Sequence, residues 1–226
     1  DTTAEELAAA LAALQGNSPG GAEQAAHDAN ALADRILAAR PDHVDALLLR
    51  ARARAALEDL PGAERDASLA LTLEPRRFDA LLIRAMARRE QADARGVLED
   101  ADLALTVPAD AVLPQVRGQA FALRAWARAK LGEPTGALED YTQAVDCDPT
   151  RAEWLVEVGN LSLQLGHLDA ALSDFTSALL LEPDNVVALL NRAAIHLRQG
   201  ALDAALADAD RAVDVMPDRA WVWVRR

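Results

Sequence analysis

Residues 152–185 read AEWLVEVGNLSLQLGHLDAALSDFTSALLLEPDN and contain the pattern from which the fold is inferred. Its first half carries apolar residues at helical spacing up to Gly166, namely Trp154, Leu155, Val158, Leu161 and Leu165. Its second half carries another helical stripe, namely Leu168, Ala171, Leu172, Phe175, Ala178, Leu179 and Leu181. Gly166 supplies the left-handed residue that ends a helix, and Pro183 stops the second helix. The stretch therefore predicts a helical hairpin.

The same pattern recurs along the chain at a period of 34 residues. The closing proline returns at Pro41, Pro75, Pro149, Pro183 and Pro217, with spacings of 34, 74, 34 and 34. The spacing of 74 leaves room for one more repeat and about six additional residues, and Pro108 closes that repeat one place early. Small residues stand at fixed distances before each proline; twelve before it are Ala63, Ala137, Ala171 and Ala205. Small side chains let helix axes approach to roughly 8–9 Å, so many of the 52 alanines have a packing role.

A 34-residue helical hairpin with small residues in fixed columns and a closing proline resembles the tetratricopeptide repeat (TPR) family. The resemblance implies an all-α, right-handed superhelical solenoid of about six hairpins, forming one domain over residues 1–226. Its expected parts are a loose hairpin 1–43, repeats 44–77 and 78–111, an insertion 112–117, repeats 118–151, 152–185 and 186–219, and the truncated start of a further helix at 220–226. Glu58 and Ala92 stand where the family prefers glycine.

The end of the chain carries two tryptophans, Trp221 and Trp223, where a seventh repeat would begin. Solenoids normally close with a polar capping helix. We therefore expect the sequence to be a fragment of a longer protein.

Composition excludes several classes of partner. Asp and Glu number 36 against 23 Lys and Arg, a net charge of −13 without a basic tract, which argues against nucleic acid or an anionic membrane. The same charge opposes a pentatricopeptide array, which shares the helical-hairpin period but binds RNA. No apolar run approaches the roughly 18–20 residues of a membrane span, so no direct membrane insertion is expected. A single cysteine cannot form an internal disulfide. We expect a soluble protein, with the cytoplasm slightly favoured and the compartment otherwise unspecified.

The most regular polar feature is an arginine followed sixteen residues later by an aspartate. The pairs are Arg50 and Asp66, Arg84 and Asp100, Arg124 and Asp140, and Arg192 and Asp208. The spacing favours a structural ladder that locks each hairpin or joins neighbouring repeats; the alternative is a row of arginines that binds anions. Repeat 152–185 lacks this arginine but keeps Asp174, which is expected to pair with Arg192.

By the resemblance, the first helices of successive repeats line a concave groove. Its N-terminal half is charged, through residues such as Asp45, Arg52 and Asp79, and its C-terminal half is apolar with embedded amides. An apolar groove with a few amides suits an extended or helical peptide. The candidate partner-binding residues are Trp126, Val156, Asn160, Leu163, Gln164, Leu190, Asn191, Ala194, Leu197 and Trp221. Trp126 is the expected anchor; alternatively, it packs against the insertion around Val112 to Val116.

Some TPR domains grip a C-terminal carboxylate with a clamp of lysines, asparagines and an arginine. Asn160, Asn191 and Arg225 match this clamp, but Val156 and Trp221 occupy both lysine positions. Losing two of three cations removes most of the attraction for a carboxylate pair, so no working clamp is expected.

The inventory for catalysis is poor. The four histidines lie in different repeats without metal-like spacing, and Cys147 has no nearby histidine in the sequence. There is no phosphate-binding loop and no Gly-x-Ser-x-Gly sequence. We expect no enzyme activity, cofactor or metal.

These observations favour a non-catalytic scaffold or adaptor that holds a peptide or partner segment in its groove. Two alternatives stay open. One is a self-assembly module in which Trp221 and Trp223 dock on another copy through the C-terminal end. The other is the regulatory TPR arm of a larger enzyme or signalling protein.

Overall fold

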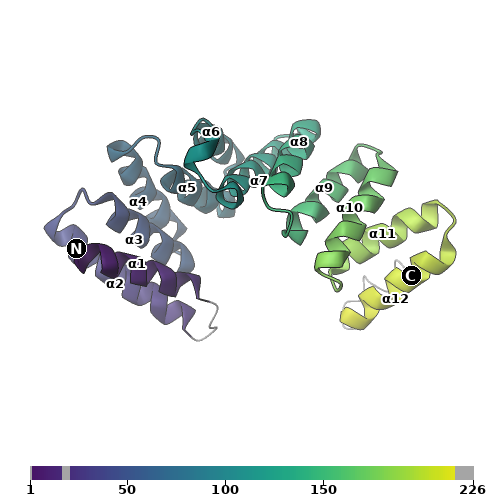
Figure 1. Ribbon diagram of the computed structural model, residues 1–226, viewed down its shortest axis with the longest axis horizontal. Coiled ribbons are helices and arrows are strands. Elements are labelled where there is room, and N and C mark those ends of the chain that lie inside the picture. The colour runs from purple at the N-terminus through teal and green to yellow at the C-terminus, as the bar shows by residue number, and fades with distance from the viewer. Residues whose placement is uncertain (1, 17–20, 217–226) are drawn as a thin grey trace. The chain divides into compact units, whose positions relative to one another are not determined.

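A computed structural model describes residues 2–16 and 21–216, and within these ranges the chain forms α-helices, turns and one short 3₁₀-helix (Figure 1). The chain divides into two compact units, an N-terminal unit, Asp1–Val112, and a C-terminal unit, Leu113–Arg226. In the described ranges, no helix combines the length and the apolar character that crossing a membrane requires.

The N-terminal unit consists of three helical hairpins. Its helices are α1 (Thr2–Gln15), α2 (Ala22–Ala39), α3 (Val44–Ala56), α4 (Leu60–Leu73), α5 (Phe78–Glu90) and α6 (Ala94–Leu105), followed by the 3₁₀-helix η1 (Ala109–Ala111). Each helix packs against the next one in the chain, so that α3 contacts α2 and α4, and α5 contacts α4 and α6. Asp59 and Asp93 cap α4 and α6 by accepting a hydrogen bond from the backbone N–H of Gly62 and Gly96.

The C-terminal unit has the same organisation. Its helices are α7 (Pro114–Lys130), α8 (Pro134–Cys147), α9 (Ala152–Gln164), α10 (Leu168–Leu181), α11 (Val186–Arg198) and α12 (Leu202–Val215). Helix α7 begins at Pro114, so four residues of the expected insertion lengthen this helix by about one turn. The prediction of an all-α solenoid of repeated hairpins is confirmed.

The turn inside each of five hairpins has one residue with a positive φ. Glycine occupies it three times, at Gly132, Gly166 and Gly200, with φ of 84°, 83° and 76°. Glu58 and Ala92 adopt the same conformation with φ of 62° and 60°. A side chain in this region costs roughly 1–2 kcal/mol, so these two turns are held by the packing of the flanking helices and not by local preference.

The small residues of the repeat allow the helices of one hairpin to meet. Ala63, Ala137 and Ala171 are fully buried. Between α9 and α10, a Cβ added to Gly159 would lie 2.8 Å from Cε1 of Phe175. Phe175 is itself fully buried and belongs to the core cluster that α9 to α12 form. Gly159 therefore provides the space that the phenyl ring fills.

The arginine–aspartate ladder is confirmed in all four hairpins. Arg50 donates from Nε and Nη2 to the two carboxylate oxygens of Asp66 at 2.9 and 2.8 Å, and the pairs of Arg84, Arg124 and Arg192 repeat this two-pronged contact. The four aspartates are buried. In three hairpins a second arginine, Arg54, Arg88 or Arg128, also donates to the same aspartate. Each aspartate in these three hairpins is thus held by two cations.

The same arginines also join neighbouring hairpins. The free Nη1 of Arg50 donates to Asp34, that of Arg84 to Ser68, and that of Arg192 to Thr176, in each case sixteen residues back in the preceding helix. The predicted pairing of Arg192 with Asp174 is therefore wrong. The guanidinium reaches the position that Thr176 occupies, and Asp174 lies two residues earlier on α10.

Asp174 is the exception in the ladder. Val158 and Ser162 stand in the columns where other repeats carry arginine, and Ser162 donates a hydrogen bond to the carboxylate. Burial raises the pKa of Asp174, and the bond from Ser162 opposes the rise without cancelling it.

Candidate functional site

Two asparagines on successive first helices of the C-terminal unit face each other. Nδ2 of Asn191 on α11 donates to Oδ1 of Asn160 on α9 at 2.8 Å, across 31 residues of sequence. Both side chains are partly buried. Within the described ranges neither amide has another hydrogen-bond partner. This leaves Nδ2 of Asn160 as a donor and Oδ1 of Asn191 as an acceptor.

The apolar candidates around this pair differ in exposure. Val156 and Leu190 are only 7% and 3% exposed and belong to the core, so they shape the surface but offer it little area. Leu163 and Ala194 are partly buried, whereas Leu197 is 56% exposed. Gln164 is exposed at the end of α9.

An apolar pocket of about 410 Å³ opens between α11 and α12. Three of the candidate residues, Leu190, Ala194 and Leu197, line it. Leu202 and Leu206 complete it and are 63% and 49% exposed. We name this surface the α11–α12 pocket.

Leu202 and Leu206 were not among the predicted site residues, although the repeat contains the signal that finds them. Their equivalents one repeat earlier are Leu168 and Leu172, which are partly buried, and Leu172 packs against the core that α10 and α11 share. Within residues 2–16 and 21–216, no thirteenth helix packs on α12 as α11 packs on α10. The columns that are covered in the inner repeat are therefore open at α12.

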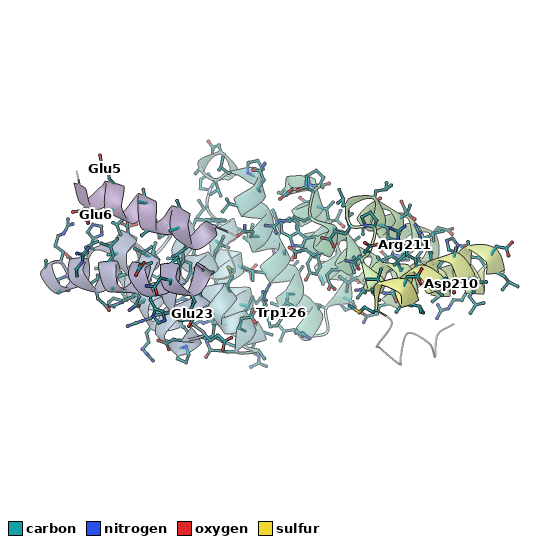
Figure 2. All side chains as sticks on the ribbon, turned by 90° about the horizontal axis from the view of Figure 1, so that it is seen from below. Glu5, Glu6, Glu23, Trp126, Asp210 and Arg211 are labelled. Atoms are coloured by element: carbon teal, nitrogen blue, oxygen red, sulfur yellow. The ribbon has the colours of Figure 1, made fainter. Side chains whose placement is uncertain are left out.

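Two tryptophans were predicted to contribute. Trp126 lies on α7 and is partly buried (Figure 2). Trp221 lies outside the described residues, as does Arg225, the third residue that matches the carboxylate clamp. The two clamp asparagines that are described bond each other, and the lysine position held by Val156 is buried.

The described residues show no arrangement that points to catalysis. No group of three or more His, Cys, Asp and Glu side chains in these ranges is placed to hold a metal ion. Burial raises the pKa of the Cys147 thiol, which keeps it in the unreactive protonated form at neutral pH. The site can offer hydrogen bonds and apolar contact.

Comparison with known proteins agrees with this geometry. Residues 156–220 match a family model described as tetratricopeptide repeat. Among solved structures, PilF of Pseudomonas aeruginosa aligns with a TM-score of 0.84 at 16% identity, covering 98% of this chain and 95% of that one. The chain has the fold of tetratricopeptide repeat proteins, and residues 156–220 match that family's model.

Two other solved structures align over most of the chain. PilW, a type IV pilus biogenesis factor, has a TM-score of 0.79 at 18% identity, covering 99% of this chain and 98% of that one. YrrB, a TPR protein with an unusual peptide-binding site, has a TM-score of 0.70 at 19% identity, covering 85% and 96%. No curated protein matches the sequence. At these identities the alignments show the fold alone.

Proposed function

We propose that this TPR protein is a non-catalytic adaptor that holds an extended segment of a partner protein along α9 and α11. The observation that carries the proposal is the Asn160–Asn191 pair. Its free donor and free acceptor match the C=O and N–H that one residue of an extended backbone presents. A backbone that is bonded in this way is recognised whatever its side chains.

The apolar surroundings give the proposed site its selectivity. Leu197 is 56% exposed and lines the α11–α12 pocket. This pocket can accommodate an aliphatic or aromatic side chain of the segment. Leu197 has about half of its surface left to bury, so covering it with such a side chain contributes roughly 1–1.5 kcal/mol, about half of the value for a whole leucine side chain. With one amide pair and one pocket, an affinity in the micromolar range is expected.

Peptide selection tests the proposal. Peptides selected from a random phage library on the immobilised protein are labelled, and their affinities are measured by fluorescence anisotropy. Asn160→Ala and Leu197→Ser should each weaken binding about 5- to 10-fold, the loss expected for one or two hydrogen bonds or for one apolar contact. Trp126→Ala should weaken it several-fold if this tryptophan anchors the segment.

The matched control is Gln143→Ala, since Gln143 is exposed on α8 and its one side-chain hydrogen bond among the described residues goes to Asp146. Its affinity should equal that of the wild type. Wild-type affinity in both the Asn160 and the Leu197 variant would reject the site, and wild-type affinity in the Trp126 variant would remove Trp126 from it.

A second candidate function is self-assembly through the C-terminal end. The exposure of Leu197, Leu202 and Leu206 on one face favours it, because an apolar face of this kind commonly marks an interface. Light scattering separates the two functions. A dimer that Trp221→Ala or Leu206→Glu dissociates supports assembly, whereas a monomer at about 100 μM, well above the usual dissociation constants of stable dimers, contradicts it.

A further inference from the structure

Asp174 is the one aspartate of the ladder column, among the described residues, that no arginine holds. In four other hairpins this aspartate accepts two hydrogen bonds from an arginine sixteen residues earlier. Val158 stands sixteen residues before Asp174, and the carboxylate is bonded by Ser162. The function proposed above uses none of these three residues.

The helices around Asp174 repeat those around Arg192 at a separation of 34 residues. Helices α8, α9 and α10 have 14, 13 and 14 residues, as do α10, α11 and α12, and each begins 34 residues before its counterpart. Consecutive helices pack against each other in both sets. Val158 on α9 has the position that Arg192 has on α11. The surroundings of Arg192 therefore show what a guanidinium group would meet beside Val158.

The guanidinium of Arg192 has two acceptors. It donates from Nε and Nη2 to the carboxylate of Asp208 at 2.8 and 2.7 Å, and from Nη1 to Oγ1 of Thr176 at 3.3 Å. The hydroxyl of Thr176 in turn donates to the backbone carbonyl of Leu172 at 2.7 Å. The guanidinium is thus held by a carboxylate on the following helix and a hydroxyl on the preceding one.

Both acceptors have counterparts beside Val158. Asp174 on α10 takes the place of Asp208, and Thr142 on α8 takes the place of Thr176. The hydroxyl of Thr142 likewise donates to the backbone carbonyl of Leu138, at 2.8 Å, so its oxygen can still accept a hydrogen bond. The receptor for a guanidinium is therefore repeated in this hairpin without its arginine.

Asp174 is also more accessible than its counterparts. The other four aspartates of the column are at most 7% exposed, whereas Asp174 is only partly buried. The four arginines keep 19–22% of their side-chain surface exposed, so the guanidinium position in the ladder borders on solvent. Valine is shorter than arginine by the whole guanidinium group. A guanidinium from outside the chain can therefore reach the carboxylate.

The charge of this hairpin favours a cation. Residues 152–185 contain six acidic residues and neither Lys nor Arg, a net charge of −6 with histidine neutral. Burial raises the pKa of the Asp174 carboxyl, and a bonded cation would offset this cost. Arginine fits better than lysine, because its planar fork bonds both carboxylate oxygens at once, whereas the ammonium group of lysine is a point charge.

We infer that Asp174 and Thr142 form a binding site for the guanidinium group of an arginine that this hairpin does not supply. The carboxylate accepts from Nε and Nη2, and the hydroxyl accepts from Nη1, as at Arg192. The arginine belongs to a partner protein or is the free amino acid, and both present the same group. The site uses neither Asn160 nor Asn191 and is separate from the segment-binding site proposed on α9 and α11.

Four probes test the site on the whole chain by NMR, through the methyl signals of Val158 and Thr142. They are N-acetyl-arginine methylamide, its lysine and citrulline counterparts, and free L-arginine. The capped arginine should bind with a dissociation constant of about 0.1–10 mM, the range for fragments of this size. Capped lysine should bind about 3-fold more weakly or worse, because it cannot bond both oxygens in parallel. Capped citrulline, which has nearly the same shape without the charge, should bind about 10-fold more weakly or worse.

The two arginine compounds distinguish the sources. Tighter binding of the capped arginine identifies a side chain within a protein, and tighter binding of free L-arginine identifies the amino acid. Equal binding of capped arginine and citrulline overturns the proposal, and so does equal binding of capped arginine and lysine. The absence of binding by either arginine compound at about 50 mM, above the expected range, overturns it as well.

Val158→Arg supplies the missing arginine from the chain itself. Arginine occupies this column in four other hairpins, so the variant should fold with a melting temperature at or above that of the wild type. Its own guanidinium should fill the site, and the Thr142 methyl signal should report binding of capped arginine about 10-fold weaker or worse. Binding that is unchanged in the folded variant overturns the proposal.

Asp174→Asn tests the site without adding a side chain. Loss of the charged acceptor should weaken capped arginine about 10-fold or more, and unchanged binding overturns the proposal. Glu157→Gln is the matched control, since Glu157 is exposed on α9 and the change in net charge is the same. Its affinity should stay within about 2-fold of the wild type, because a distant exposed charge is screened. Asn160→Ala should leave the affinity unchanged, so failure of this site is distinguishable from failure of the segment site.

Discussion

The close packing of Gly159 against Phe175 permits a test in which the effect of one substitution on stability changes sign when the phenyl ring is removed. A methyl group added at residue 159 would meet Cε1 of Phe175 at 2.8 Å and Cζ at 2.9 Å, and the ring is fully buried. Overpacking of this kind costs about 1–3 kcal/mol. Replacing glycine by alanine within a helix gains about 1 kcal/mol. Gly159→Ala should therefore destabilise the protein by up to about 2 kcal/mol, the difference between these two effects.

Removing the ring removes the opposing contribution. Phe175→Ala leaves a cavity and should cost about 3–5 kcal/mol by itself. In that background Gly159→Ala keeps only the helix-propensity gain and fills part of the cavity, so it should stabilise the protein by about 1 kcal/mol. The coupling between the two residues is then about 1–3 kcal/mol.

Urea unfolding followed by far-ultraviolet circular dichroism measures all four proteins of the cycle. If Phe175→Ala leaves too little folded protein, Phe175→Leu provides a milder background with the same expected change of sign. The reasoning is refuted if Gly159→Ala shifts the unfolding midpoint by the same amount and in the same direction with and without the ring.

Asp174→Asn should stabilise the protein at pH 7 by less than about 1 kcal/mol, because the pKa of this half-buried carboxyl is raised in the folded state and its ionisation therefore opposes folding. In thermal melts the gain in melting temperature should disappear when the pH falls below the ordinary pKa of aspartate, where the carboxyl is neutral in both states. The matched control Asp208→Asn breaks the two-pronged pair with Arg192 and should destabilise by about 1–3 kcal/mol; stabilisation there, or destabilisation at Asp174, would contradict the argument. Glu58→Gly should stabilise by about 0.5 kcal/mol, since relief of the positive φ exceeds the added flexibility of the unfolded chain. Gly166→Ala should destabilise by about 1 kcal/mol from backbone strain alone, because an added Cβ meets no atom within 4 Å; an unchanged melting temperature for either turn variant would show that the turns are not strained.

Much of the fold follows from residues at fixed separations along the chain. The prolines and alanines of the 34-residue period place the hairpins, and a separation of sixteen residues pairs Arg50 with Asp66 and its three counterparts. These features can be predicted from the sequence because the two helices of a hairpin and their short turn are close together in the chain, and because the same pattern recurs in each repeat. At Glu58 and Ala92 the turn has the same positive φ as in the other hairpins, although the residue is not the glycine that this conformation favours.

The candidate site was less accessible to the same reasoning. A column position does not reveal whether a side chain is covered, so Val156 and Leu190 were grouped with Leu197 although the first two are buried. Leu202 and Leu206 belong to columns that an inner repeat covers, and their exposure depends on what packs against α12. Exposure is a property of the neighbouring helix, which the residue's own repeat does not encode.

Hydrogen-bond choice shows the same division. The sequence supplied Asp174 and Arg192, Asn160 and Asn191, and Arg52 among its acidic neighbours, but it did not show which of these would meet. In the packed structure Arg192 donates to Thr176, and Asn191 donates to Asn160 across 31 residues. Asp79 accepts a hydrogen bond from Arg77 and none from Arg52. The periodic pattern thus determined the helices, their order and the ladder within each hairpin, because those depend on separations that recur along the chain. Which polar groups remain free to bind a ligand was decided only in three dimensions, because a short and directional bond forms with whichever partner the packed helices bring within 3 Å.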